Sequence, residues 1–474
     1  MTPLERLTGI PILRRTRPLV AGVYLLFLLV AFGFEVGPLS INVGVAYWGG
    51  WAAWLISAAG AVWGWSHSNE SWRLRLKGAI GVLLWLAVCA ATASRAELFI
   101  LALAVGQFTV LVHAAVNSAA WKNFFTLLER KPALLLVVSF AGVIAVGSLL
   151  LMLPSATTDH QGAQSVDAVF TATSATCVTG LIVLNTAEDT WANPKLRTFS
   201  RFGQLVILFL IQIGGLGIMT LSASLLIVVG RSLALHRVAA LGDLLDESQG
   251  KALEKSVAYI LKMTVVSEAI GTALLYAAFQ REAANPSEAF YQALFHSISA
   301  FCNAGFSLFG DSLSAYAADP LVSLTVSGLI IVGGLGYSVV ALIASVEPLH
   351  RRRGSFARWG LHAQMVVTMT VALLLIGWVA TFYVEYDRSL ADLDLGGKLL
   401  ASFFQSVTVR TAGFNTVEMG LLHRSTMFLY IIMMFIGASP GGTGGGVKTT
   451  TVGVLLLAVR AVMYSRRDIE AWGR

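Results

Sequence analysis

Three short polar segments interrupt an otherwise apolar chain, and each begins with Phe and ends ten residues later with Gly. They run from Phe170 to Gly180, from Phe295 to Gly305 and from Phe403 to Gly413, and are rich in Thr, Ser and Cys. A pattern that recurs along a chain indicates one structural unit used three times. Polar, glycine-ended backbone within apolar surroundings needs protein or a water-lined pathway beside it, and we expect a cation pathway.

Apolar runs of about 20 residues, the length that crosses a ~30 Å hydrocarbon layer, surround these segments. Hydrophobic residues make up 56% of the 474 residues and charged residues only 12%, about half of the charged share of soluble domains. We therefore expect an all-α integral membrane protein. Ten spanning helices are expected, beginning near Leu19, Trp48, Gly78, Leu98, Ala133, Phe202, Val257, Leu321, Leu361 and Met427.

Basic residues predict the orientation in the membrane. Most of the 33 Lys and Arg residues fall in six segments, 1–17, 66–78, 116–131, 231–256, 348–358 and 464–474. Because cytoplasmic loops carry an excess of Lys and Arg, we expect a plasma-membrane protein with both termini in the cytoplasm. The net charge of +7 follows from this topology, so the expected partner is the lipid bilayer and not nucleic acid.

The chain is expected to contain an accessory part and three repeats. Residues 1–124 hold four helices without a polar glycine-ended segment, which we interpret as an accessory transmembrane domain. Residues 125–240, 241–353 and 354–474 each hold a helix, a short semi-polar helix, a glycine turn and a second helix. Each repeat lies between basic inside loops, so we expect parallel helix–pore loop–helix repeats around an axis along the membrane normal.

The short helix of each repeat is expected to enter the membrane and turn back. Residues 165–175 would be about 16 Å long at 1.5 Å per residue, roughly half of the hydrocarbon thickness. The helix C-terminus, with its partial negative charge, would point toward the pore axis. Capping and acidic residues predict the outer ends of these helices: Ser165, Asp167, Ser287, Glu288, Asp392 and Asp394.

The backbone that follows each short helix is the candidate selectivity filter, because free carbonyls can replace the hydration shell of a cation. Glycine allows the positive φ that turns successive carbonyls to one side. The alternative is that these glycines only permit close helix packing. The candidate K⁺-binding residues are Thr176, Cys177, Val178, Thr179, Gly180, Phe301, Cys302, Asn303, Ala304, Gly305, Val409, Arg410, Thr411, Ala412 and Gly413.

At the strings ATCVTGL, SAFCNAGFS and VTVRTAGFN, with GGTGGGVKTTT downstream, the chain resembles the Trk/Ktr/HKT superfamily of potassium transport proteins, and its Ktr branch above all. The resemblance covers about residues 125–474. It implies potassium uptake without catalysis, a K⁺-selective filter at the three glycines, and no cofactor beyond the transported ion, with Na⁺ or H⁺ left open as a coupling ion. It also implies a homodimer on a cytoplasmic ring of nucleotide-binding regulatory subunits.

The resemblance further implies a glycine-rich loop that gates the pore beneath the filter. The segment 437–447 interrupts the apolar run 427–462 in that place. Lys448 is expected to hold the loop, with snorkelling to the inner surface as the alternative. A phosphate-binding loop is not expected, because Val447 separates Gly446 from Lys448. The expected gating residues are Gly437, Gly441, Gly442, Thr443, Gly444, Gly445, Gly446 and Lys448.

Two further features concern the surroundings of the filter. Arg410 is expected to brace the third loop by binding carbonyls or a carboxylate such as Asp311 or Glu418, since a guanidinium that faced the ion would repel it. The glycine clusters Gly214–Gly217 and Gly333–Gly336 lie in the second helices of the first two repeats. Close helix packing is the expected reason for both, with lining of the pathway below the filter as the alternative.

The resembled family has four repeats, and this chain carries three. We expect the fourth beyond Arg474, in a longer chain; a second polypeptide that supplies it, or an incomplete pore, are the alternatives. Two other functions stay open. A secondary carrier for a small solute would predict inverted repeats, against which the parallel orientation argues. A membrane scaffold with a defunct pore would show no flux.

Overall fold

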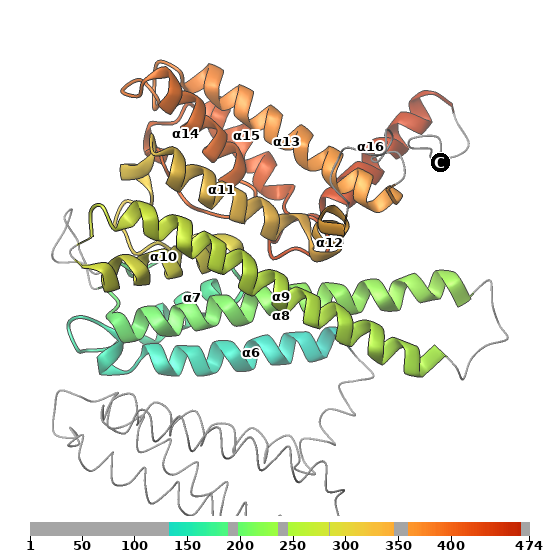
Figure 1. Ribbon diagram of the computed structural model, residues 1–474, viewed down its shortest axis with the longest axis horizontal. Helices are drawn as coiled ribbons and strands as arrows, with labels where there is room; N and C mark the ends of the chain where they lie inside the picture. Colours follow the sequence, from blue (N-terminus) through green and yellow to red (C-terminus); the bar gives the residue numbers. More distant parts are fainter. Residues whose placement is uncertain (1–131, 188–197, 236–244, 284, 346–358, 466–474) are drawn as a thin grey trace, which may run out of the picture. The chain divides into compact units, whose positions relative to one another are not determined.

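The computed structural model describes residues 132–187, 198–235, 245–283, 285–345 and 359–465 (Figure 1). These parts are helical and hold no strand beyond the isolated bridges Asn185–Thr198 and Ile436–Val447. The accessory domain predicted in residues 1–124 lies outside them. The chain divides into two compact units, the first made of Met1–Ser139 with Leu153–Ala163 and the second of Phe140–Met152 with Gln164–Arg474.

In the first unit the structure describes residues 132–139 and 153–163. The former begin helix α6 (Pro132–Leu151), and the latter contain the 3-10 turn η2 (Pro154–Ala156). Thr157 closes the turn that follows: its hydroxyl accepts a hydrogen bond from the Gly162 N–H (2.9 Å) and donates one to Asp159 (2.7 Å).

In the second unit one order of elements occurs three times: a long helix, a short helix, and a further long or broken helix. The first copy is completed by α7 (Ser165–Thr176) and α8 (Arg201–Leu235). The second comprises α9 (Leu245–Phe279), α10 (Pro286–Phe301), η3 (Ser314–Tyr316), α11 (Pro320–Leu335) and α12 (Tyr337–Ser345). The third comprises α13 (Leu361–Glu385), α14 (Leu395–Thr408), η5 (Met419–Leu421), α15 (Arg424–Phe435) and α16 (Thr449–Met463).

Three helices in the described ranges are long and apolar enough to cross a membrane by themselves: Arg201–Thr220 within α8, Lys255–Phe279 within α9, and α13. The run predicted from Met427 consists of two shorter apolar helices, α15 and α16, on either side of the glycine-rich loop. The run predicted from Ala133 contains the shorter apolar helix Val137–Leu151. The four helices predicted before it lie outside the described residues.

The spanning helix predicted from Leu321 is broken, which corrects the expectation of one continuous helix. The direction of the helix bends by 109° between its two parts, α11 and α12. Gly336 lies at the break with φ +89°, a conformation that residues with a Cβ rarely adopt. The Tyr337 N–H, freed by the break, donates to the Gly441 carbonyl at 3.2 Å. A distant loop therefore stabilises the bend.

The predicted caps of the short helices are partly wrong. The N-caps of α7 and α10 are Gln164 and Asn285, and neither side chain makes a capping hydrogen bond. Ser165 and Ser287 lie inside their helices, because α7 begins one residue earlier, and α10 two residues earlier, than a serine cap requires. Asp394 does cap α14, with its carboxylate accepting from the backbone N–H three residues later at 2.8 Å.

The three copies contact one another in chain order. Helix α8 of the first copy packs against α9 and α10 of the second, and α11 of the second packs against α14 of the third. Within the copies, α7 contacts α8, α10 lies against α9, and α14 lies against α13 (Figure 1). An ion pair between Arg201 and Glu288 also joins α8 to α10. This packing brings the C-terminal ends of the three short helices into one region.

Candidate functional site

The chain leaves each short helix through the same backbone conformation. In each loop two residues have positive φ: the glycine and the residue two positions before it. A non-glycine residue with positive φ is uncommon, so three at matching positions indicate a shared geometry. The angles are 56° and 80° at Val178 and Gly180, 59° and 72° at Asn303 and Gly305, and 72° and 89° at Thr411 and Gly413.

A hydroxyl in the last turns of each short helix fixes the backbone just past the glycine. Ser174 donates to the Leu181 carbonyl at 2.7 Å, Ser299 to the Phe306 carbonyl at 2.8 Å, and Thr408 to the Phe414 carbonyl at 2.8 Å. In all three cases the acceptor belongs to the residue that follows the glycine. The brace was not predicted from the sequence, although the hydroxyl residues themselves are visible in the repeats.

The three glycines lie against one another. A Cβ on Gly180 would stand 2.5 Å from the Ala304 carbonyl oxygen, and a Cβ on Gly305 would overlap the Ala412 carbonyl oxygen. The same Cβ on Gly305 would stand 3.0 Å from the Cα of Gly413. Segments that are far apart in the sequence thus meet at three glycines. The close backbone approach leaves no room for a Cβ at Gly180 or Gly305, whereas at Gly413 the nearest atom would be 3.5 Å away and the positive φ of 89° is what favours glycine.

A cavity of about 740 Å³ opens on these glycines. Gly180, Gly305 and Gly413 line it, and no other predicted filter residue does. Three carboxylates from the second and third copies also line it, those of Asp311, Asp392 and Glu418. The described lining contains no Lys or Arg, so the cavity is electronegative and favours cations.

The remaining predicted filter residues do not line this cavity, and most of them are buried. The side chains of Thr176, Phe301, Ala304, Val409 and Ala412 are buried. Cys177 and Cys302 hold matching positions but differ, since Cys177 is exposed and Cys302 is buried. Cys302 packs against α8, where a Cβ on Gly215 would stand 2.6 Å from its sulfur.

The glycine clusters of α8 and α11 pack against the ends of the short helices, as expected. A Cβ on Gly214 would overlap the Thr176 carbonyl, and one on Gly333 would overlap the Phe301 carbonyl. Gly336 has a different role, because it forms the break between α11 and α12. Close packing therefore explains Gly214, Gly215 and Gly333 but not Gly336.

The glycine-rich loop between α15 and α16 folds back on itself and docks on α11. The Gly437 N–H donates to the Val447 carbonyl (3.1 Å) and the Ala438 N–H to the Gly445 carbonyl (3.0 Å), which closes the loop. The Ser439 and Thr443 N–H groups donate to the carbonyls of Gly334 and Gly333, each at 3.0 Å. These carbonyls are free because α11 ends at the next residue, Leu335.

The same loop touches the second and third filter loops. The Thr443 hydroxyl donates to the Phe301 carbonyl at 3.0 Å. A Cβ on Gly444 would stand 2.5 Å from the Thr411 hydroxyl and 3.0 Å from the Asn303 side-chain amide. Lys448 donates to the Gly444 carbonyl at 2.8 Å, so it holds the loop from within. The loop therefore lies directly against the filter loops on the side away from the cavity.

Arg410 extends from the third filter loop into the protein, where its side chain is 7% exposed. Its Nη2 donates a long hydrogen bond of 3.5 Å to the Gly437 carbonyl, while its Nε has no partner among the described residues. Of the two kinds of partner expected for Arg410, a carbonyl or a carboxylate, the structure shows a carbonyl. Asp311 and Glu418 line the cavity beside the three glycines instead.

Two buried carboxylates among the described residues, Glu268 and Glu385, were not predicted from the sequence. Glu268 lies in the apolar part of α9, 8% exposed, and accepts a hydrogen bond from Gln212 of α8 at 3.4 Å. Gln212 in turn accepts from the Cys302 thiol at 4.0 Å. An acidic residue within an apolar run was the signal, since such residues within membrane helices are rare and usually face the protein interior.

A tyrosine joins two connecting segments of the second copy, the one that follows α9 and the one before α11. Tyr316 in η3 donates a hydrogen bond to Glu282 at 2.8 Å. Burial raises the pKa of Tyr316, and the hydrogen bond to Glu282 adds to the rise. The Tyr316 phenol therefore keeps its proton and donates it in the hydrogen bond to Glu282. No group of three or more His, Cys, Asp or Glu side chains that could hold a metal ion occurs among the residues described.

The fold and the site together define a polytopic helical membrane protein built around three glycine loops. Residues 105–469 match the family TrkH, described as cation transport protein. The match covers most of the chain, so the chain belongs to the TrkH cation transport family. Proteins of this kind are ion transporters and not enzymes.

The names of individual relatives are more specific than the description of the family. The chain is 38% identical to Ktr system potassium uptake protein B of Vibrio alginolyticus over 342 residues, which cover 72% of this chain and 71% of that protein. It is 35% identical to the Bacillus subtilis protein of the same name, over 72% of this chain and 73% of that one. It is also 35% identical to potassium/sodium uptake protein NtpJ of Enterococcus hirae, over 72% of each.

A solved structure shares the fold. The crystal structure of the potassium transporter TrkH from Vibrio parahaemolyticus matches with a TM-score of 0.56, covering 82% of this chain and 76% of that chain. The sequence identity is 19%, so the likeness is one of fold.

Proposed function

We propose that this protein takes up K⁺ across the plasma membrane through a filter of backbone carbonyls, and that the glycine-rich loop gates the pathway beneath the filter. Family membership and the relatives named as potassium uptake proteins support the substrate. The observation that carries the proposal is the threefold recurrence of one loop geometry, with matching φ angles and braced carbonyls, around one cavity.

The filter would work by replacing water with carbonyl oxygens. Stripping a cation of its hydration shell is costly unless oxygens are already in place. Positive φ two residues before each glycine and at the glycine itself re-aims the intervening carbonyls, which supports such a role. The hydroxyl braces behind the loops would keep these oxygens from collapsing inward or spreading apart. The partial negative charge at the C-terminal ends of α7, α10 and α14 would also favour a cation.

The outer cavity would collect cations before they enter. Asp311, Asp392 and Glu418 line it together with the three glycines. A recess lined by one sign of charge raises the local concentration of ions of opposite sign. The cavity would thus be the outer vestibule, and inward movement would be driven by the membrane potential, worth ~2.3 kcal/mol per charge per 100 mV.

The glycine-rich loop would close the pathway on the other side. It contacts both Phe301 of the second filter loop and Thr411 of the third, and Lys448 holds its shape. Its attachment to the end of α11 uses backbone hydrogen bonds alone. Such bonds can be exchanged for water when the loop moves, because each contributes only about 0.5–1.5 kcal/mol net.

Orientation, assembly and ion coupling complete the proposal. Both termini would face the cytoplasm, and the protein would act as a homodimer on a cytoplasmic nucleotide-binding ring, as the family resemblance implies. The Enterococcus hirae relative is named for both potassium and sodium. Na⁺ is therefore the competing or coupling ion that flux measurements must include, with H⁺ as the further choice.

Growth rescue tests the proposal. A strain that lacks K⁺ uptake is expected to grow at low K⁺ when it expresses the protein, and Gly180→Ser is expected to reduce the preference for K⁺ over Na⁺. Gly328→Ser is the matched control, because a Cβ on Gly328 of α11 meets nothing within 4 Å. Absence of rescue by protein that is shown to reach the membrane would contradict the proposal.

A further inference from the structure

The third filter loop differs from the other two at the position three residues before the glycine. The first two loops have Cys177 and Cys302 there, and the third has Arg410. In the second loop the Cys302 side chain is directed behind the loop, toward α8, whereas Cys177 of the first loop is exposed. A much longer side chain from the same position in the third loop can reach beyond the filter.

Arg410 reaches the beginning of the glycine-rich loop. Its guanidinium donates to the carbonyl of Gly437, the second residue after α15. The N–H of that same residue donates to Val447, at the other end of the loop. Arg410 is thus bonded at the point where the two ends of the loop meet.

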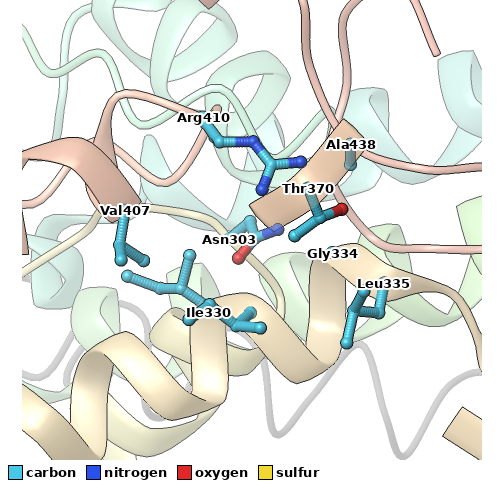
Figure 2. Close-up of a pocket in the computed structure, with 9 residues that line it drawn as sticks. Asn303, Ile330, Gly334, Leu335, Thr370, Val407, Arg410 and Ala438 are labelled. Atoms are coloured by element: carbon cyan, nitrogen blue, oxygen red, sulfur yellow. The ribbon is translucent and has the colours of Figure 1, made fainter. Parts of the chain in front are cut away.

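The surroundings of Arg410 come from four elements. Its side chain lines a small enclosed cavity of about 10 Å³ together with Asn303 of the second filter loop, Gly334 of α11, Thr370 of α13 and Ala438 of the glycine-rich loop. Figure 2 shows the guanidinium extending toward Ala438 and Thr370, with Asn303 beside it. Every element that faces Arg410 therefore belongs to a filter loop, to the gate loop or to a helix that supports them.

No carboxylate lines this cavity, so the buried charge depends on carbonyl and hydroxyl dipoles. A buried charge without a counter-ion is strongly disfavoured unless hydrogen bonds compensate it. The Gly437 carbonyl is the compensating group that Arg410 bonds. Displacing the loop would leave the guanidinium without this acceptor, and displacing the third filter loop would pull on Gly437. Arg410 therefore favours one paired arrangement of filter and loop.

We propose that Arg410 is a positioning residue that couples the third filter loop to the glycine-rich loop, and that its bond to Gly437 stabilises the closed position of that loop. That the bonded position of the loop is the closed one rests on the proposed function. The contact between the third filter loop and the glycine-rich loop can be tested without any transport. No cation needs to touch Arg410 for this role. Coupling free energies of this kind correspond to about 5- to 150-fold changes in an equilibrium.

The test measures how often the loop leaves its place. Ser439 is fully buried in the loop and bonds Thr449 (2.8 Å), so a cysteine at this position reacts with a water-soluble thiol reagent only when the loop moves. In full-length protein carrying Ser439→Cys, the labelling rate is compared with and without Arg410→Met, which keeps most of the side-chain volume. Arg388→Met, at an exposed residue, is the matched control. Protein without Ser439→Cys gives the background from native cysteines.

The proposal expects Arg410→Met to raise the labelling rate about fivefold or more and Arg388→Met to leave it unchanged. In liposomes, Arg410→Met is also expected to raise K⁺ flux. An unchanged labelling rate overturns the proposal, even where K⁺ flux is normal. If Arg410→Met does not fold, Arg410→Lys replaces it, with a raised rate supporting the coupling and an unchanged rate overturning it. Raised labelling in protein that conducts no K⁺ supports the coupling and contradicts the proposed function instead.

Discussion

Adjacent glycines in the glycine-rich loop provide the sharpest test of the gate. Gly444 and Gly445 are neighbours in sequence but differ in surroundings. A Cβ on Gly444 would stand 2.5 Å from the Thr411 hydroxyl, 2.7 Å from the Ala438 Cβ and 3.0 Å from the Asn303 side chain. A Cβ on Gly445 would meet nothing within 4 Å. Gly444→Ala should therefore force the loop away from the filter loops, and Gly445→Ala should not.

The size of the effect follows from the overlap. Inserting one methyl group into a tightly packed place typically costs 1–3 kcal/mol, about 5- to 150-fold in an equilibrium constant. That cost falls on the position in which the loop touches Thr411 and Asn303 and is relieved when the loop moves. Gly444→Ala is thus expected to increase the open fraction by roughly tenfold, at about 1.4 kcal/mol per decade.

The assay is K⁺ flux into liposomes that contain equal amounts of the two variants and of the unaltered protein. We expect faster flux for Gly444→Ala, little change for Gly445→Ala, and similar thermal stability for all three. Equal flux for the two variants would refute the argument that the loop obstructs the pathway. Slower flux for Gly444→Ala with reduced K⁺ over Na⁺ preference would show that the overlap deforms the filter instead.

Further predictions concern the brace, the loop and the vestibule. Ser299→Ala removes the bond to the Phe306 carbonyl, worth about 0.5–1.5 kcal/mol, and should lower the K⁺/Na⁺ permeability ratio about two- to tenfold; Thr173→Ala, whose hydroxyl bonds only its own helix at Val169, is the control. Lys448→Met removes the bond to the Gly444 carbonyl and should raise K⁺ flux, so unchanged flux would support snorkelling as the role of Lys448. Asp392→Asn should slow K⁺ uptake at low ionic strength and have little effect in 1 M salt, where charges more than about 3 Å apart are screened; a loss that does not depend on salt would argue against steering.

The sequence predicted the local features of the loops well. The Phe-to-Gly spacing predicted short helices that end just before the filter segments. Helix α14 ends at Thr408, just before its segment, and α7 and α10 end one residue later than predicted, at Thr176 and Phe301, the first residues of theirs. This prediction succeeded because the signal is local: a semi-polar helix followed by glycine carries its own stop signal. The interruption of the last apolar run by the glycine-rich loop was equally visible, because seven of its residues are Gly or Thr within one short segment.

Features that depend on distant partners could not be predicted. The break at Gly336 is stabilised by Gly441, more than one hundred residues later. The glycine cluster around Gly336 did not predict it, because the similar cluster Gly214–Gly217 lies within the continuous helix α8. The partner of Arg410 is a backbone carbonyl, which has no signature in a sequence, whereas Asp311 and Glu418 were visible as charges. The caps at Ser165 and Ser287 failed because each helix begins earlier, at Pro286 in the second case, where proline suits the first turn.

The central claim is that a cation binds among the three glycine loops, and anomalous diffraction from crystals containing Tl⁺, a heavy stand-in for K⁺, tests it directly. The account predicts an anomalous peak between the backbones of Gly180, Gly305 and Gly413, which weakens when K⁺ is added in excess. Peaks confined to Asp311, Asp392 and Glu418 in the outer cavity, with none among the loops, would contradict it.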